Sequence, residues 1–150
     1  MEKGSYLRDE FQTGPGKTVL KTDELVKEIV IPFLRNIFMP KFEKLGPRKA
    51  ADIAIVNVTA GMETEDGICK NPKVALGAVA PKVIRAEHLE AYLKDKRLDE
   101  IDIEKAANIA AYDDASPISD FRSTKEYRTE MVEVLIERAL SAMLGQRGEV

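Results

Sequence analysis

Hydrophobic positions along the chain change their spacing once, at Pro81. Before that residue they form short runs that are rich in β-branched side chains, which is the pattern of β-strands. After it they recur every three or four positions, which is the pattern of helices with one buried face. The expected strands lie within residues 24–32, 38–45, 52–60 and 73–80. The first is expected to stop at Pro32, because proline has no N–H to donate to a neighbouring strand.

The third and fourth of these strands are predicted to form a β-hairpin. They are joined through Glu65, Asp66 and Gly67, and glycine accepts the positive φ that a tight turn requires. One face of the first hairpin strand carries small side chains, namely Ala54, Val56, Val58 and Ala60. This face is therefore expected to lie under a closely packed helix.

Three helices are predicted after Pro81. Apolar residues at helical spacing mark the first two: Ala86, Leu89 and Leu93, and then Ile103, Ala106, Ala107 and Ala110. The second of these helices is expected to begin at about Asp102, a residue type that often caps helices.

The third helix has the clearest boundaries in the sequence. Ser123 and Glu126 have the spacing of a capping box, in which the two side chains satisfy free backbone amides at the helix start. Gly145 is the predicted stop. The expected apolar face consists of Tyr127, Met131, Val134 and Leu135.

Strands come first in the chain and helices afterwards, without alternation. This order predicts an α+β fold: a small antiparallel β-sheet of three to four strands, followed by a three-helix layer that covers one face of the sheet. The length of 150 residues suits one domain.

Composition narrows the possible partners and surroundings. With 44% hydrophobic and 33% charged residues, the chain has the composition of a soluble globular protein. Its net charge of −3 argues against nucleic acid, whose phosphates bind clustered lysine and arginine. No apolar run approaches the ~18 residues of a spanning helix, and Cys69, as the single cysteine, excludes an intrachain disulfide. We expect a cytoplasmic protein that binds neither nucleic acid nor membrane.

Residues 13–18 read TGPGKT and invite comparison with a phosphate-binding loop. Such a loop needs a first glycine five positions before the glycine-lysine pair, where the backbone turns tightly around the phosphates. That position is Phe11. The stretch is therefore predicted to be a glycine-proline turn that leads into a strand.

Few residues suggest catalysis. His88 is the single histidine, and it is expected on a solvated helix face. Cys69 has no histidine base near it in sequence, which argues against a nucleophile. Asp113, Asp114 and Asp120 lie between predicted helices, where aspartates commonly act as caps. No catalytic residue and no metal site is predicted, and the chain is expected to assist a reaction that is carried out elsewhere.

Several blocks of the chain resemble, in order, the FAD-binding subunit of molybdenum hydroxylases, the xanthine dehydrogenase and carbon monoxide dehydrogenase family. The similarity runs from about residue 8 to about residue 142. It lies in residues 11–20, 23–25, 29–32, 42–54, 76–81, 84–86, 116–123, 126–128 and 138–140. The similar part of that subunit is its carboxy-terminal domain, which has an α+β fold. The resemblance implies that residues 1–24 are a linker segment of the flavin subunit and that residues 25–150 form this domain.

In that family the molybdenum subunit hydroxylates a substrate, iron–sulfur clusters relay the electrons, and the flavin subunit passes them to an acceptor. The resemblance implies that the chain covers the flavin ring through Leu25, Val26, Phe42 and Lys44. Apolar groups shield the ring from water, and a lysine favours the anionic reduced flavin. The alternatives are core packing for Phe42 and a solvated strand edge for Lys44.

Two further residues of the similar blocks, Arg48 and Asp52, are expected to form an ion pair or a cap with a structural role. They are not counted among the predicted contacts to the flavin ring.

The family holds the pyrophosphate and adenosine of FAD in glycine-rich loops of a preceding domain, and residues 1–24 contain no such loops. We therefore expect FAD to bind only together with a separate flavin-binding domain, and none to this chain alone. The expected partners are that domain, an iron–sulfur subunit and a molybdopterin subunit, with homo-oligomers possible in isolation. The chain is a split half of the flavin subunit, a truncated piece, or a descendant that lost the flavin role.

The alternative function is a flavin-free scaffold or assembly protein that keeps the fold and acts as a homo-oligomer. Under either hypothesis the chain is not catalytic by itself, and under the first it is part of an oxidoreductase.

Overall fold

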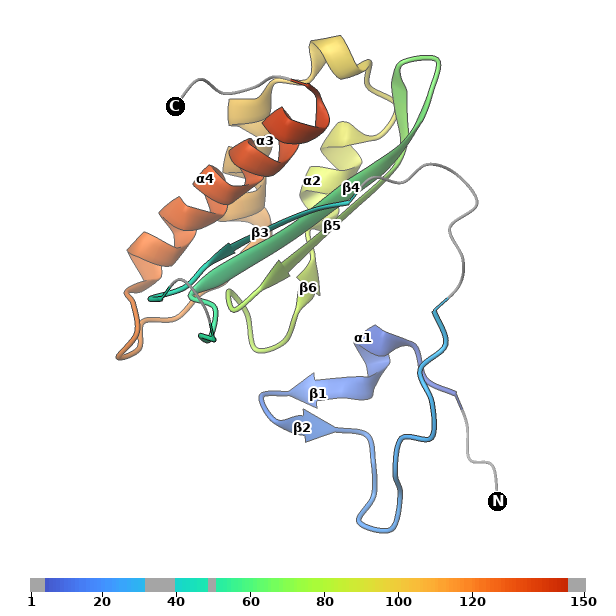
Figure 1. Ribbon diagram of the computed structural model, residues 1–150, viewed down its shortest axis with the longest axis vertical. Helices are drawn as coiled ribbons and strands as arrows, with labels where there is room; N and C mark the ends of the chain where they lie inside the picture. The colour runs from blue at the N-terminus through green and yellow to red at the C-terminus, as the bar shows by residue number, and fades with distance from the viewer. Residues whose placement is uncertain (1–4, 32–39, 49–50, 146–150) are drawn as a thin grey trace.

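The computed structural model describes residues 5–31, 40–48 and 51–145. Its main body consists of a sheet and helices, and a small N-terminal unit lies beside it (Figure 1). The N-terminal unit contains α1 (Arg8–Phe11), β1 (Gln12–Gly14) and β2 (Lys17–Thr18). The body contains β3 (Lys41–Leu45), β4 (Val56–Glu65), β5 (Ile68–Gly77), β6 (Ile84–Arg85), α2 (Glu87–Leu93), η1 (Leu98–Glu100), α3 (Ile103–Ile109), η2 (Ala110–Asp114) and α4 (Lys125–Met143).

The sheet of the body has the strand order β3-β4-β5-β6, and each neighbouring pair is antiparallel. β4 and β5 form the predicted hairpin, and Asp66 and Gly67 at its turn both have positive φ. The hairpin strands reach closer to this turn than the hydrophobic pattern indicated, because β4 ends at Glu65 and β5 begins at Ile68.

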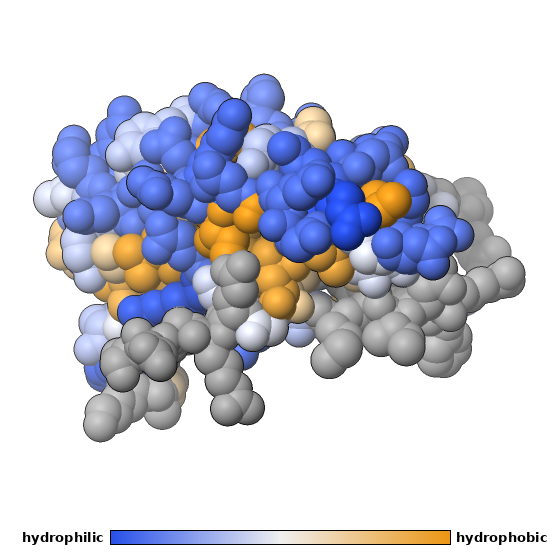
Figure 2. Space-filling view, turned by 90° about the horizontal axis from the view of Figure 1, so that it is seen from above, coloured by the Kyte–Doolittle hydropathy of each residue, from blue (hydrophilic) through white to orange (hydrophobic). Residues whose placement is uncertain are grey.

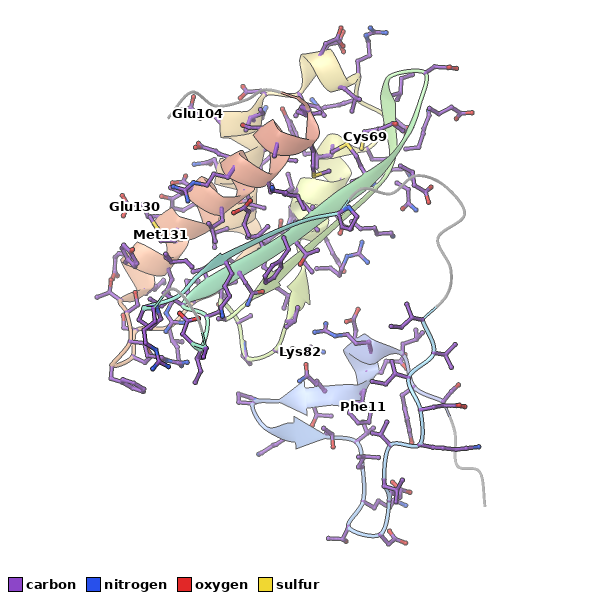
Figure 3. The ribbon with its side chains drawn as sticks, in the orientation of Figure 1. Phe11, Cys69, Lys82, Glu104, Glu130 and Met131 are labelled. Atoms are coloured by element: carbon purple, nitrogen blue, oxygen red, sulfur yellow. The ribbon has the colours of Figure 1, made fainter. Side chains whose placement is uncertain are left out.

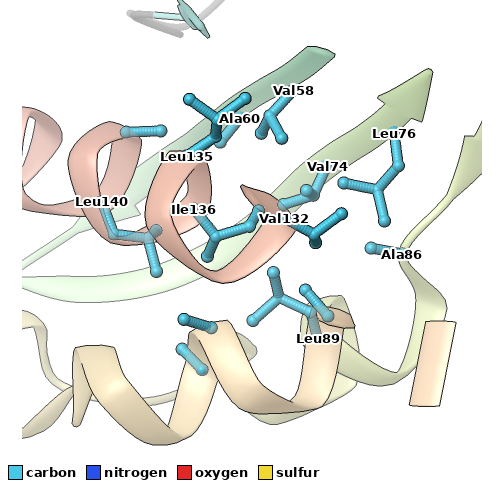
Figure 4. Packing of buried hydrophobic residues seen from close by; sticks show 14 of the residues in the cluster. Val58, Ala60, Val74, Leu76, Ala86, Leu89, Val132, Leu135, Ile136 and Leu140 are labelled. Carbon is cyan, nitrogen blue, oxygen red and sulfur yellow. The ribbon is translucent and has the colours of Figure 1, made fainter. Parts of the chain in front are cut away.

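The helices lie together on one face of the sheet, as predicted for an α+β fold (Figure 1). The side chains of Val56, Val58 and Ala60 are fully buried on that face, and α4 packs against β4. Figure 4 shows Leu135 and Ile136 of α4 among these strand residues. The small side chains of β4 thus mark the face that a helix covers. On the outside of the molecule, hydrophilic residues occupy most of the coloured surface in the view of Figure 2.

The expected first strand is wrong for the residues that the structure describes. Residues 24–31 form no strand, and Pro32 lies outside the described residues. A β-strand forms only where a neighbouring strand accepts and donates its backbone hydrogen bonds, and in the described part of the chain none pairs with this segment. The second expected strand is β3, although positions 38 and 39 lie outside the described residues.

The first two predicted helices are confirmed. α2 buries Leu89 and Leu93, and α3 begins after Asp102. An Oδ1 atom of Asp102 accepts a hydrogen bond from the Lys105 N–H at 3.0 Å, which is the expected cap.

The third predicted helix, α4, begins one residue later than expected. Thr124 is its N-cap, and the Thr124 Oγ1 accepts a hydrogen bond from the Tyr127 N–H at 3.2 Å. The predicted capping box from Ser123 is therefore wrong, because an N-cap bonds the amide of its third following residue. The predicted stop is confirmed, since Gly145 follows the C-cap with φ of 73°.

The buried face of α4 also differs from the prediction. It consists of Arg128, Val132, Leu135, Ile136, Ala139 and Leu140. Tyr127, which was expected on this face, is 42% exposed. The buried face includes Arg128 because its side chain finds acceptors inside the protein, a circumstance that apolar spacing does not indicate.

The TGPGKT stretch is a hairpin turn, as predicted, between β1 and β2. The N-terminal unit that contains it is attached to the body after β5, where the Lys82 Nζ donates to the Asp9 carbonyl oxygen at 2.7 Å. Arg8 adds a hydrogen bond to the Val83 carbonyl oxygen at 3.1 Å. Figure 3 shows Lys82 between the body and this unit.

Candidate functional site

The candidate site is the face of the sheet opposite the helices, which we call the open face. Side chains alternate along a strand, so the neighbours of the buried Val58 point to the open face. Cross-strand pairing then builds one row over all four strands, in which Phe42 lies opposite Thr59, Thr59 opposite Ala75, and Ala75 opposite Arg85.

Two of the predicted site residues, Phe42 and Lys44, lie on the open face, next to each other on β3. Phe42 is 58% exposed, so core packing does not describe it. Lys44 lies opposite Asn57, one step along the same face. The structure therefore brings an exposed aromatic ring and a lysine to one edge of a sheet face that no described helix covers.

Lys44 is held in place by Asp52. Its Nζ donates hydrogen bonds to the Asp52 Oδ1 at 2.7 Å and to the Asp52 carbonyl oxygen at 2.8 Å. A lysine ammonium has three N–H groups, so one remains for another acceptor. The side chain of Lys44 is 34% exposed, and that of Asp52 is 5% exposed.

The loop between β3 and β4 is built around the Asp52 carboxylate. Its Oδ2 accepts a hydrogen bond from the Arg48 N–H at 3.1 Å. A Cβ atom on Gly46 would overlap this carboxylate, so the close approach requires glycine. Hydrogen bonds first from Lys44 and then from Arg48 hold the pKa of Asp52 below its ordinary value. The ion pair predicted for Asp52 is confirmed, with Lys44 as its partner. Arg48 contributes its backbone N–H to Asp52, and its guanidinium donates to the Ala51 carbonyl oxygen at 2.6 Å.

At the other edge of the open face, Arg85 is fixed by Glu90. The Arg85 Nε donates to the Glu90 Oε1 at 2.6 Å, and the same oxygen accepts from the Val74 N–H at 2.7 Å. A hollow of about 290 Å³ lies beside this pair. Its polar lining includes Thr59, Glu63, Asn71, Lys73 and Arg85.

The other two predicted site residues, Leu25 and Val26, do not lie on the open face. They are 81% and 49% exposed and belong to the extended segment that precedes residue 32. Figure 1 places this segment beside the N-terminal unit, away from β3. In the described residues the structure thus brings together two of the four predicted contacts.

The other candidate residues of the sequence have structural surroundings. Asp114 accepts hydrogen bonds from the N–H groups of His88 and Leu89, each at 3.0 Å, so it caps α2 as an aspartate between helices was expected to do. The His88 side chain is 68% exposed, which confirms a solvated helix face. Cys69 is fully buried, and burial raises the pKa of its thiol to about 11, which disfavours a nucleophilic thiolate.

Within the described ranges, no three His, Cys, Asp or Glu side chains are grouped as metal ligands would be. The same ranges contain no helix with the length and apolar character needed to span a membrane.

Sequence reasoning missed one residue that organises this end of the body, the buried Arg128 of α4. One of its terminal nitrogens donates to the Ala78 carbonyl oxygen at 2.8 Å, and the other to the Asp120 Oδ1 at 2.7 Å. It also reaches the Ile55 carbonyl oxygen at 3.3 Å. The signal was its helical spacing to Val132, but an arginine is normally assigned to the exposed face.

Comparison with known proteins gives the family. The family described as the CO dehydrogenase flavoprotein C-terminal domain matches residues 41–143, which is nearly the whole described body. The chain belongs to this family. The sequence-based resemblance is thereby confirmed, and it now has boundaries that coincide with β3 and the end of α4.

Relatives of this flavoprotein domain support the same assignment. The xanthine dehydrogenase FAD-binding subunit of Escherichia coli O157:H7 is 27% identical over 140 residues, covering 92% of this chain and 47% of that protein. The carbon monoxide dehydrogenase medium chain of Hydrogenophaga pseudoflava is 30% identical over 134 residues, covering 89% of this chain and 46% of that protein. The chain spans about half the length of the curated relatives it matches.

Solved structures share the fold of this domain. A carbon monoxide dehydrogenase from Hydrogenophaga pseudoflava, which lacks the Mo-pyranopterin moiety of the molybdenum cofactor, matches with a TM-score of 0.79 and 29% identity. That match covers 92% of this chain and 47% of the solved chain. Quinoline 2-oxidoreductase from Pseudomonas putida 86 matches with a TM-score of 0.76 and 26% identity, over 91% of this chain and 47% of the solved one.

Proposed function

We propose that the chain is the C-terminal domain, or a separately encoded half, of the FAD-binding subunit of a molybdenum hydroxylase. The observation that carries this proposal is the family match over residues 41–143. The names of the relatives support it, because they include a xanthine dehydrogenase FAD-binding subunit and a carbon monoxide dehydrogenase medium chain. The chain would cover the flavin and dock to partner subunits while electrons pass through.

The open face fits the ring of FAD and not its phosphates. When bound, FAD supplies a ring system that accepts and passes on electrons. Phe42 offers an exposed aromatic surface that excludes water from such a ring. Lys44 offers a positive charge with one free N–H, held in position by Asp52. The glycines of residues 13–18 form a hairpin turn, so the phosphates require groups from another domain.

Because the ring and the phosphates of FAD would be bound by different domains, we propose the following cofactor and partners. FAD binds together with a separate flavin-binding domain, and an iron–sulfur subunit and a molybdopterin subunit complete the enzyme. Leu25 and Val26 join Phe42 and Lys44 as ring contacts after assembly. We also propose that residues 1–24 are the linker, that residues 25–150 form the domain, and that the enzyme is cytoplasmic. By itself the chain carries out no reaction.

The flavin-free scaffold is the less favoured function. The relatives of this chain are named as FAD-binding subunits or medium chains of dehydrogenases. Asp52 holds Lys44 in a defined position on the open face. A contact to a flavin ring uses such an oriented charge, whereas a scaffold function does not require it.

Purification of the chain from its native source under mild conditions tests the proposed function. We expect co-elution with a chain that carries glycine-rich flavin loops, with iron–sulfur and molybdenum subunits, and with visible flavin absorbance. A colourless homo-oligomer that contains none of these chains would overturn the flavin function and leave the scaffold.

A further inference from the structure

Asn57 places a side-chain amide on the open face, beside the proposed flavin contacts. It alternates with the buried Val56 and Val58 along β4, so its side chain points away from the helices. Cross-strand pairing sets it opposite Lys44 on one side and opposite Gly77 on the other. Asn57 is half-buried, and β4 is an inner strand of the sheet. The amide therefore lies within the open face and not at its edge.

The position of the Asn57 amide depends on Gly77 of β5. A Cβ atom at position 77 would lie 2.4 Å from the Asn57 Oδ1 and 2.8 Å from its Nδ2. Non-bonded atoms pack best at about 3.5–4.0 Å, so the amide occupies space that any larger residue at position 77 would fill. Glycine at position 77 thus allows the amide to lie across the neighbouring strand.

The hydrogen-bonding groups of this amide are free. An asparagine side chain has two N–H donors and a carbonyl oxygen with two lone pairs. Within the described residues, no partner bonds to those of Asn57. Two other polar groups of the open face are paired, Lys44 with Asp52 and Arg85 with Glu90. A ligand that covers the open face removes water from the Asn57 amide, which costs free energy unless the ligand supplies both an acceptor and a donor.

The flavin ring has such groups in its pyrimidine part, whose edge alternates carbonyl oxygens with ring nitrogens. Lys44 relates this part of the ring to Asn57. A positive charge favours the anionic reduced flavin when it lies near the pyrimidine part, where the negative charge resides. Directly opposed side chains on neighbouring strands have Cβ atoms about 5 Å apart. A ring that meets the Lys44 ammonium therefore lies beside Asn57.

We propose that Asn57 binds the pyrimidine edge of the flavin ring, with its Nδ2 donating to a ring carbonyl oxygen and its Oδ1 accepting from the ring N–H. The proposal rests on the proposed function and adds a residue to its flavin site. Phe42 covers the ring and Lys44 supplies charge, whereas Asn57 fixes which edge of the ring enters the site. Gly77 is a positioning residue, because it admits the amide to its place.

Isotope-edited infrared spectroscopy of the bound flavin tests this contact in the assembly purified from the native source. The flavin carries carbon-13 at its ring carbonyls. Asn57→Leu keeps a side chain of similar size and removes its hydrogen-bonding groups. We expect this variant to raise the frequency of a flavin carbonyl band. It should also release flavin about tenfold faster, as expected for the loss of about one neutral hydrogen bond.

Asn71→Leu is the matched control for Asn57→Leu. Asn71 is also half-buried and lies on the open face, where it lines the hollow. Its strand partner is Glu63, six residues beyond Asn57 on β4 and thus about 20 Å away. The control should change neither the carbonyl band nor the rate of flavin release. Urea unfolding of each isolated chain checks that the variants fold.

Gly77→Ala tests the position of the amide without changing its chemistry. The added methyl group takes the space that the Asn57 amide occupies, so the amide must move. Gly77 does not have a positive φ, so alanine keeps its backbone conformation. This variant is expected to shift the same carbonyl band as Asn57→Leu, and it carries the test if Asn57→Leu does not fold.

The outcomes separate this contact from the proposed function. An unchanged carbonyl band and release rate in Asn57→Leu and Gly77→Ala would overturn the contact, while the flavin function stands. Equal changes in Asn57→Leu and Asn71→Leu would also overturn it, since they would reflect a general disturbance of the open face. A band shift in Asn57→Leu alone would support the contact and overturn the role of Gly77. If the unaltered assembly contains no flavin, the flavin function itself fails.

Discussion

At the scale of single residues, the clamp between Lys44 and Asp52 connects a loop to the open face. Asp52 accepts from Lys44 and Arg48, and Gly46 leaves the space for its carboxylate. The Asp52 carboxylate compensates the lysine charge and, together with the Asp52 carbonyl oxygen, accepts two of the three N–H groups of Lys44. Lys44 is thus a positive charge held in place by Asp52, and its net electrostatic effect on a neighbouring group depends on the charge of Asp52.

This arrangement predicts opposite effects of two substitutions on the flavin of the assembled enzyme. Lys44→Met removes the positive charge and is expected to lower the flavin reduction potential, because that charge favours the anionic reduced ring. Asp52→Asn removes the compensating negative charge and is expected to raise it. The measurement is a redox titration that follows the flavin spectrum. Lys73→Met is the control, since Lys73 also lies on the open face but on β5, two strands away from Lys44. Equal potentials in all four proteins would show that Lys44 acts away from the ring.

Asp120 predicts how stability depends on pH. Hydrogen bonds from Arg122, and further ones from Arg128, hold the pKa of Asp120 well below its ordinary value. A lowered folded-state pKa contributes stability that is fully present above the unfolded-state pKa of about 3.9 and is lost as the pH falls through the folded-state pKa. Urea unfolding at about pH 6 and about pH 3 is expected to show a smaller loss for Asp120→Asn than for the unaltered chain. Asp113→Asn, at an exposed aspartate, should behave like the unaltered chain.

At the scale of elements, α4 is positioned by its first turn. Thr124 caps it, and Ser119 accepts a hydrogen bond from the Lys125 N–H at 2.8 Å. One turn further along, Arg128 bonds to the carbonyl oxygens of Ile55 and Ala78, which lie before β4 and after β5. The start of α4 and the ends of the central hairpin are therefore one connected structure.

The cap of α4 gives a direct test of its start. Thr124→Ala is expected to lower the free energy of unfolding by about 1 kcal/mol, because it leaves a backbone amide without its acceptor. Ser123→Ala is the matched control, since the Ser123 hydroxyl makes only a long contact of 3.5 Å with the Thr124 carbonyl oxygen. Denaturant unfolding of both variants shows whether Thr124 or Ser123 is the N-cap of α4. A larger loss for Ser123→Ala would restore the capping box read from the sequence.

At the scale of the whole molecule, the body and residues 24–31 differ in how their apolar side chains are packed. The body has its own core, in which residues of α2, α4, β4 and β5 pack together (Figure 4). The segment of residues 24–31 has no such core around it in the described residues, and its apolar side chains are exposed. The isolated chain should therefore fold as a body and associate through the segment.

Self-association of the isolated chain is expected to depend on the exposed apolar side chains of residues 24–31. Exposed β-branched runs pair with one another when their own partner is missing. Ile29→Lys is expected to shift the chain toward monomer by about tenfold in dissociation constant, which corresponds to about 1.4 kcal/mol. Sedimentation velocity at several concentrations measures this shift. Ile118→Lys, at an isoleucine that is 71% exposed in the loop before α4, should leave the association unchanged, and an equal effect of both variants would point to a general gain in solubility.

The sequence predicted much of the fold and half of the candidate site's geometry. Phe42 and Lys44 are two positions apart on a strand, so period-two alternation already places them on one face. Whether that face is exposed or buried depends on α4, which covers Val58 and Ala60 on the other face. The spacing of residues in β3 alone does not reveal this. Asp52 was expected in an ion pair or cap, but its partner Lys44 became visible only in the folded loop.

By itself, the sequence determined the α+β order, the β4–β5 hairpin, the three helices and the turn in residues 13–18, because each depends on neighbouring residues along the chain. Only the tertiary structure decided that residues 24–31 belong to no described strand, that Thr124 caps α4 and that Arg128 is buried. The physical reason is that a strand, a cap and a buried charge are each defined by groups that meet them in space. Residues 24–31 pair with no strand of the described chain, and a sequence pattern alone cannot supply a neighbouring strand.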